Sequence, residues 1–142
     1  MNLITYPNEI LRTPSTDITD IANNEIQTLA SDMYDYVKNT DALGLSACQV
    51  GVNKNLFICK LKTNIFIVIN PTIIVKSGNY RSYNEGCLSL PGERRTIKRK
   101  KLFKIKYRDI NGAEQILRCE KFEAAVVQHE MDHLNGKLII DY

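Results

Sequence analysis

Several kinds of residue are scarce in this sequence, and each scarcity excludes a class of protein. Cysteine occurs four times among 142 residues, at positions 48, 59, 87 and 119, and no two cysteines form a C-x-x-C pair. This spacing argues against a disulfide framework and favours reduced thiols in a cytoplasm. The seven glycines and four prolines are too few for a fibrous or low-complexity chain.

Long apolar runs and a large excess of one charge are also missing. No apolar segment approaches the roughly 18 residues of a membrane span, and the first residues lack the basic end and apolar stretch of a secretory signal. We therefore expect no membrane attachment. Nineteen lysines and arginines against 16 aspartates and glutamates leave a net charge of +3, which gives no reason to expect DNA as a partner.

The rest of the composition, with 44% hydrophobic and 25% charged residues, is that of a globular protein. Residues 1–142 contain no linker or repeat and are expected to form a single compact domain. Periodicity predicts helices over residues 23–38 and 121–135, loops over 1–20 and 41–51, and strands over 56–62, 65–70, 72–83, 101–108 and 115–119. This order indicates an α+β fold with mostly antiparallel sheets packed around the C-terminal helix.

The strongest chemical signal is an H-E-x-x-H pattern, His129-Glu130-Met131-Asp132-His133, on the last predicted helix. The chain has only two histidines, and random placement gives this spacing beside a glutamate in roughly one sequence in a thousand. Residues four apart lie on one helix face, so the two imidazoles can share a metal ion while Glu130 reaches its water. The pattern predicts a metal centre with an acid–base residue.

A catalytic metal of this kind needs a third protein ligand and one open coordination position. A related pattern places a third histidine where this chain has Ile139, and no glutamate follows His133, so the third ligand is expected upstream. Cys87, in the segment E-G-C-L-S-L-P, is favoured, and Cys48 is the alternative. The other two cysteines lie in strand patterns and are expected to be core residues.

Two further features have both a functional and an ordinary explanation. Gln49 lies in a loop of small residues, where its amide could donate a hydrogen bond to a developing oxyanion, although a lone glutamine is usually a surface residue. The segment between Arg94 and Arg108 holds nine basic residues. They predict either a solvated sheet face or a weak contact with RNA or the ribosome.

Three segments of the chain together resemble the peptide deformylase family. The family has a Gly-rich motif ending in Gln, here ALGLSACQ at residues 42–49, then E-G-C-L-S at 85–89 and Q-H-E-x-D-H at 128–133. The motifs occur in the family's order, and the resemblance covers almost the whole chain. The family usually has Gly at Ala42 and Ala at Ser46, so both residues are expected to add atoms close to the substrate path.

The resemblance implies one deformylase-like catalytic domain over residues 1–142, which removes the formyl group from N-terminal formyl-methionine of new peptides. It implies that Cys87, His129 and His133 bind one divalent ion, natively Fe(II), with Zn, Ni or Co in some preparations. The short end after the last helix is similar to virus-encoded members of the family.

The resemblance also implies roles for residues around the metal. Glu130 is expected to be the general base and acid, and Gln49 and the backbone N–H of Leu88 are expected to hold the oxyanion. The substrate-binding residues implied are Leu43, Gly44, Tyr83, Glu85, Gly86, Arg94, Phe122, Ala125 and Val126. The expected partners are formyl-Met nascent peptides and, weakly through basic residues, the ribosome, with the protein acting as a monomer in the cytoplasm.

Two other functions are compatible with the same histidine pattern. A zinc endopeptidase would use the H-E-x-x-H segment for internal peptide bonds, but it usually needs a downstream ligand and a long cleft. A structural zinc domain would need a fourth protein ligand, such as Cys48, in place of water.

Overall fold

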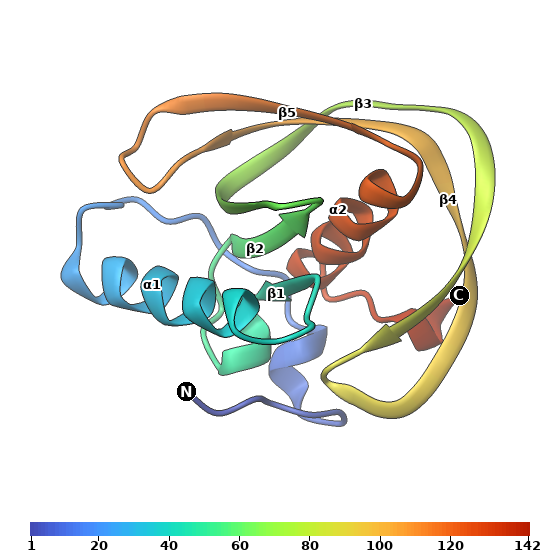
Figure 1. Cartoon of the computed structure of the whole chain (residues 1–142). Coiled ribbons are helices and arrows are strands. Elements are labelled where there is room, and N and C mark those ends of the chain that lie inside the picture. The colour runs from blue at the N-terminus through green and yellow to red at the C-terminus, as the bar shows by residue number, and fades with distance from the viewer.

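The computed structural model describes all residues 1–142 as one body of two α-helices and a five-stranded sheet (Figure 1). The helices are α1 (Asn24–Lys38) and α2 (Lys121–Leu134). The strands are β1 (Gly44–Ser46), β2 (Leu56–Leu61), β3 (Asn64–Cys87), β4 (Leu90–Arg108) and β5 (Glu114–Glu120). Three short 3-10 helices complete the chain: η1 (Glu9–Arg12), η2 (Ala47–Val50) and η3 (Ile139–Asp141). This confirms the expected α+β class.

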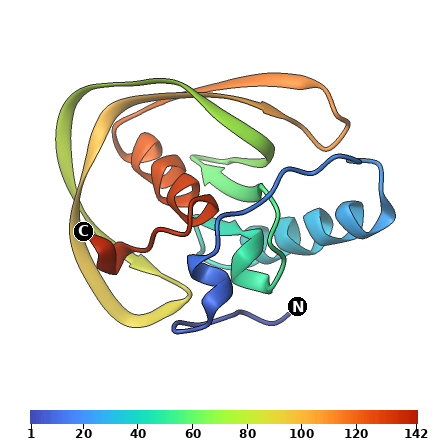
Figure 2. The same ribbon diagram turned by 180° about the vertical axis from the view of Figure 1, so that it is seen from behind.

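The sheet is antiparallel throughout, and its strands follow one another in chain order. The β3–β4 pair is long, and its register shifts between Ile69 and Thr72, between Ser77 and Tyr80 and near Gly86. Such irregularities bend a strand and increase its twist. The pair therefore curls around α2, as both ribbon views show (Figures 1 and 2).

Helix α2 is packed inside this curl because apolar residues surround most of its circumference. Ala124, Val127 and Met131 pack with Phe57 on β2 and Phe103 on β4 in the largest buried apolar cluster. A helix that is apolar on several faces is stable only when it is covered on several faces. The sheet and the N-terminal segment pack over these faces of α2. The two histidines of α2 therefore lie in the interior.

Helix α1 covers the outside of β2 with one apolar stripe, in which Ala30, Met33 and Val37 are fully buried. Asn23 caps the helix by accepting a hydrogen bond at 2.8 Å from the backbone N–H of Glu25. The predicted start and end of this helix are therefore confirmed. No helix of the structure is long and apolar enough to cross a membrane.

Three segments differ from the predicted elements. Residues 41–51 are not only a loop, because they contain β1 and η2, and the N-terminal segment contains η1. Strand β3 runs without a break to Cys87, and β4 begins at Leu90, eleven residues before the predicted start at Lys101. These outer parts of the two strands are mostly exposed, so they lack the apolar pattern that marks a half-buried strand.

Candidate metal centre and active site

The three expected metal ligands come from two elements that the fold brings together. His129 and His133 lie one turn apart on α2, and Cys87 is the last residue of β3. Their donor atoms all lie within 4.8 Å of one another, and the Cys87 sulfur is 3.4 Å from Nε2 of His133. A tetrahedral ion with bonds of about 2.0–2.3 Å places its ligand atoms about 3.6 Å apart. The donor set therefore fits a single divalent ion, and with no fourth protein donor it has the composition of a catalytic site.

Cys48, the alternative ligand, lies behind this group. Its thiol is buried and contacts the backbone carbonyl oxygen of His133 at 3.9 Å. Burial raises the pKa of Cys48 to about 12, and a thiol that keeps its proton is a poor metal ligand. The arrangement gives no support to a structural zinc site that includes Cys48.

The orientation of His129 is set from behind by Glu85. Nδ1 of His129 lies 2.8 Å from Oε1 of Glu85, which leaves Nε2 free to face the Cys87 sulfur. Burial lowers the pKa of His129, but hydrogen bonds to Cys87 and Glu85 outweigh burial and raise the pKa to about 10. A metal ion bound at Nε2 of His129 would displace the proton carried by that nitrogen.

His133 is held in the opposite protonation state. Burial, together with the positive charges of His129 and Arg99, lowers the pKa of His133 well below its usual value. The ring is therefore neutral, which is the form of imidazole that binds metals.

Glu85 is in turn held by a buried ionic network centred on Arg99. The Arg99 guanidinium donates two hydrogen bonds of 2.8 Å to the Glu85 carboxylate and one of 2.7 Å to Asp132 on α2. The hydroxyl of Tyr142 donates to Asp132 at 2.6 Å and lies 2.9 Å from Arg99. Burial raises the pKa of Glu85, but the hydrogen bonds to Arg99 and His129 outweigh burial and lower the pKa. A buried carboxylate that stays ionised is a strong acceptor for His129.

Glu130 lies beside the donor set and is almost fully buried. One oxygen of its carboxylate accepts a 2.7 Å hydrogen bond from the hydroxyl of Ser46 on β1. Burial raises the pKa of Glu130, and neither the nearby charge of His129 nor the Ser46 hydrogen bond cancels that effect. A carboxylate with a raised pKa, next to a metal site, has the properties of a general base.

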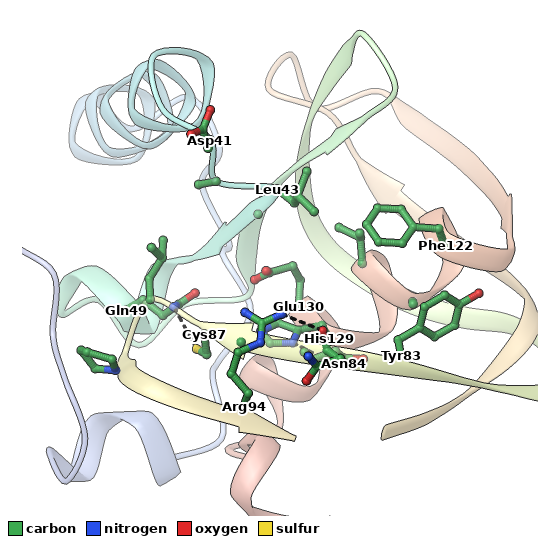
Figure 3. Close-up of a pocket in the computed structure, with 18 residues that line it drawn as sticks. Asp41, Leu43, Gln49, Tyr83, Asn84, Cys87, Arg94, Phe122, His129 and Glu130 are labelled. Carbon is green, nitrogen blue, oxygen red and sulfur yellow. Dashed lines mark hydrogen bonds and ion pairs between the residues drawn. The ribbon is translucent and has the colours of Figure 1, made fainter. Parts of the chain in front are cut away.

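The Gln49 side chain has one orientation that satisfies its neighbours. Its Oε1 accepts a hydrogen bond of 2.9 Å from the backbone N–H of Ser46, so its NH₂ group must point the other way. Nε2 lies 3.2 Å from the hydroxyl of Ser89 and 3.7 Å from the Cys87 sulfur. The NH₂ group of Gln49 therefore points toward the space beside the three metal-ligand candidates (Figure 3).

A cavity of about 680 Å³ opens onto these groups. Figure 3 shows Leu43, Tyr83 and Phe122 on one side of it and Gln49 and Cys87 on the other. Every substrate-binding residue implied by the resemblance lines this cavity, namely Leu43, Gly44, Tyr83, Glu85, Gly86, Arg94, Phe122, Ala125 and Val126, together with Leu88, His129 and Glu130. The fold thus brings together residues from three distant segments of the chain.

Two of these lining residues have close partners of their own. Arg94 donates a 2.8 Å hydrogen bond to the carbonyl oxygen of Asn84, and its guanidinium lies across Gly86. A Cβ at Gly86 would be 2.6 Å from the Arg94 guanidinium, so a larger residue there would displace the guanidinium from its present position. The carboxylate of Glu85 borders the cavity while it binds His129 and Arg99.

Two expectations from the sequence need correction. Ala42 does line the cavity, but Ser46 does not: it is fully buried beneath Glu130, so its hydroxyl adds nothing to the substrate path. The basic segment 94–108 is not uniformly a solvated face, because Arg99 is only 3% exposed. Asp132 and Tyr142, which both contact Arg99, were not predicted to take part. The only available signal was Asp132, a fixed residue of the Q-H-E-x-D-H motif to which no role was given.

The fold and this site define a class of protein: a hydrolase in which an H-E-x-x-H helix and an upstream cysteine form a group that could hold a metal ion beside a buried carboxylate. The family described as Polypeptide deformylase matches the chain over residues 1–142. The chain belongs to this family, whose members are metal-dependent enzymes.

Relatives and solved structures agree with this assignment. The chain is 41% identical to "Peptide deformylase 1" of Clostridium perfringens, over 99% of this chain and 96% of that one, and 38% identical to the peptide deformylase of Borreliella burgdorferi, over 100% and 87%. The crystal structure of the Thermotoga maritima peptide deformylase superposes with a TM-score of 0.93 at 32% identity, covering 99% of this chain and 95% of that one. The Synechococcus elongatus enzyme in complex with actinonin also has a TM-score of 0.93, at 35% identity, covering 99% and 77%.

Proposed function

We propose that this protein removes the formyl group from N-terminal formyl-methionine of newly synthesised peptides and releases formate. The proposal rests on one observation: a Cys-His-His group of metal-ligand candidates, the Glu130 carboxylate and the Gln49 amide lie together at one end of a partly apolar cavity. Membership of the peptide deformylase family supports the same reaction.

Cys87, His129 and His133 are the proposed ligands of one divalent ion, natively Fe(II), with Zn, Ni or Co able to replace it. When bound, such an ion supplies Lewis acidity, which lowers the pKa of a water molecule and polarises the formyl carbonyl. A thiolate and two neutral imidazoles are donors that suit each of these metals. Metal analysis of freshly purified protein, combined with activity measured in air and without oxygen, would identify the native ion.

The protein's own side chains carry out the proton transfers. Glu130 accepts a proton from the water that attacks the formyl carbon, and then delivers a proton to the amine as the carbon–nitrogen bond breaks. The amide of Gln49 and the backbone N–H of Leu88 donate hydrogen bonds to the oxygen that becomes negative in the transition state. The products are formate and a free N-terminal amine.

The rest of the cavity holds the peptide. Leu43, Tyr83 and Phe122 form the sides of a slot for the methionine side chain, and Ala125 and Val126 on α2 form its floor. The rings of Tyr83 and Phe122 meet edge to face, with centroids 6.1 Å apart, and this contact supports the slot. Gly44, Glu85, Gly86 and Arg94 line the path of the peptide backbone.

Initial rates on formyl-Met-Ala-Ser, followed as released amine and formate, test this function directly. The expected result is turnover of the formyl peptide with the acetyl-Met-Ala-Ser peptide nearly inert, because an acetyl group adds a methyl where the cavity meets the donor set. Comparable rates on the two peptides would overturn the proposal. Cleavage of internal bonds in an unformylated peptide would instead support the endopeptidase alternative.

We further propose a weak contact of the protein, as a monomer in the cytoplasm, with the ribosome. The register pairs Lys104 on β4 with Arg118 on β5, and exposed Lys98 and Lys106 extend the same basic strand region. Four free cysteines agree with a reducing compartment. Cosedimentation with ribosomes that weakens as salt rises is the expected result, and binding that does not depend on salt would exclude this basic face as the contact.

A further inference from the structure

Strand β1 contacts the carboxylate of Glu130 at two points. The Ser46 hydroxyl lies 2.7 Å from Oε2 of Glu130, and no other side chain forms a hydrogen bond with that carboxylate. Ser46 is fully buried and Glu130 is 4% exposed. The hydroxyl therefore has no water to compete for its single proton, and a hydrogen bond to a buried charged acceptor is among the strongest that a serine makes.

The second contact is with Gly44, two residues earlier on the same strand and so on the same face of it. A Cβ at Gly44 would lie 2.8 Å from the carboxyl carbon of Glu130 and closer still to Oε1. Glycine thus leaves the space that Oε1 occupies, and Gly44 itself lines the cavity. One oxygen is held by a hydroxyl, and the other lies against bare backbone at the cavity wall.

We propose that Ser46 is a positioning residue for the reaction: its hydroxyl holds Oε2 of Glu130, so that Oε1, beside Gly44, is the oxygen that accepts and returns the proton. The terminal torsion of a glutamate has a broad energy minimum, so the carboxylate needs an external contact to fix its plane. A base held in one orientation avoids reorganisation during each turnover. This inference rests on the proposed role of Glu130 as the base.

A purely structural role for Ser46 would have a different signature. Its oxygen also lies 3.4 Å from the backbone carbonyl of Glu130, so the hydroxyl could instead serve to attach β1 to α2. In that case its loss would lower thermal stability and metal content, and activity would fall only in proportion to them. The shorter distance to the carboxylate favours the positioning role.

The test is Ser46→Ala, which deletes one oxygen and adds no atom. One hydrogen bond to a charged group corresponds to about a tenfold to hundredfold change in rate. We expect kcat to fall by about that factor, KM to stay within about twofold, and one equivalent of metal to remain bound. Ser31→Ala, at an exposed position of α1, is the control and is expected to leave kcat unchanged.

A double-mutant cycle with Glu130→Gln separates positioning from every indirect effect. If the hydroxyl acts through the base, Ser46→Ala causes no further loss of kcat in the Glu130→Gln background. An equal loss in both backgrounds, or an unchanged kcat in the single variant, overturns the inference. An inactive wild-type protein in the same assay would instead refute the proposed deformylation, so the two failures are distinguishable.

Discussion

At the scale of single residues, differences in burial divide the four cysteines into unreactive and accessible thiols. Cys48, Cys59 and Cys119 are buried, and burial raises the pKa of each of them. Cys87 is only partly buried and faces two imidazoles. The first three are therefore packing residues, while Cys87 is the thiol that is accessible for chemistry.

This contrast predicts a pattern of alkylation. In metal-free protein at pH 8, iodoacetamide is expected to modify Cys87 and to leave Cys48 unmodified, since a thiol of pKa about 12 is almost entirely protonated there. Added Zn or Ni should protect Cys87, because a metal-bound thiolate is not free to react. Peptide mass spectrometry of the labelled protein provides the measurement. Metal-dependent protection of Cys48 in place of Cys87 would mean that the ligand has been misassigned.

Glu130 provides a second residue-scale prediction. Glu130→Gln keeps the shape of the side chain and its contact with Ser46, but the amide cannot accept a proton. Turnover of a formyl-Met peptide is expected to fall by at least about 100-fold, the scale of a lost general base, while one equivalent of metal stays bound. Near-normal turnover in the variant would assign the base to another group.

The sequence was sufficient for the residues whose chemistry follows from local spacing. The positions of His129, Glu130 and His133 on one helix follow from the helical repeat alone, and the structure places the two histidines beside Cys87. Local spacing only favoured Cys87 over Cys48, and both thiols lie near α2 in the fold. Ser46 could not be found in this way, because its partner lies 84 residues away.

At the scale of secondary-structure elements, α2 is fixed at its end by a close backbone contact. Gly136 follows the helix with φ of +72°, a conformation that favours glycine. A Cβ there would lie 2.7 Å from the carbonyl carbon of Arg12 in η1. The end of α2 thus packs directly on the N-terminal segment, and this contact stabilises the position of the helix that holds the two histidines.

We therefore predict that Gly136→Ala destabilises the protein more than Gly112→Ala. Both glycines have positive φ, +72° and +83°, but a Cβ at Gly112 would meet nothing within 4 Å. Backbone strain alone costs about 1–2 kcal/mol at either site, and the clash at Gly136 adds to it. Thermal or urea unfolding of the two variants measures the difference. Equal losses of stability in the two variants would show that the Arg12 backbone in η1 moves away from the added Cβ without lowering the free energy of unfolding further.

The junction of β3, β4 and α2 depends on Arg99. Arg99→Lys keeps the charge but loses the two-pronged bond to Glu85 and cannot reach Asp132 at the same time. Since Glu85 orients His129, we expect metal affinity to fall by about 10-fold to 100-fold, the usual effect of losing a partner behind a ligand. Competition with a chelator measures it. Arg95→Lys, within an exposed pair with Glu93, is the control and is expected to have no effect.

The helices and inner strands were predictable because their apolar residues recur at the period of the element. The outer part of β4 was not, since residues 90–100 are mostly exposed and are held by pairing with residues 80–87 of β3. Hydrogen bonds between the backbones of two strands do not require a regular pattern of apolar residues in either strand's sequence. The Arg99 network was missed for a related reason, as a buried arginine within a basic run looks like its exposed neighbours.

At the scale of the whole molecule, the cavity belongs to no single element. Its wall takes residues from three segments, 41–49, 83–94 and 122–130, which meet only because the sheet curls around α2. Leu43 and Phe122 remain substantially exposed, at 42% and 54%, and an unfilled apolar slot of this kind favours an apolar side chain from the substrate. Selectivity for the first residue of the peptide is therefore a property of the assembled fold.

This geometry predicts how the protein discriminates among formylated peptides. Methionine is unbranched and flexible, so it can enter the slot between Leu43 and Phe122, whereas a β-branched valine or a charged aspartate cannot fill it. A missing or misplaced methylene is worth about 10-fold to 200-fold in rate. We expect kcat/KM for formyl-Met peptides to exceed that for matched formyl-Val and formyl-Asp peptides by at least about tenfold. Initial rates on the three tripeptides give the ratio.

A variant of the slot shows whether that preference arises there. Phe122→Ala removes one side of the slot without touching the donor set, so kcat/KM for formyl-Met should fall while that for formyl-Val changes little. Bound metal and the rate on a formyl-Gly peptide, which places no side chain in the slot, serve as controls and are expected to be unchanged. If Phe122→Ala lowered all three rates by the same factor, the methionine side chain would have to bind elsewhere in the cavity.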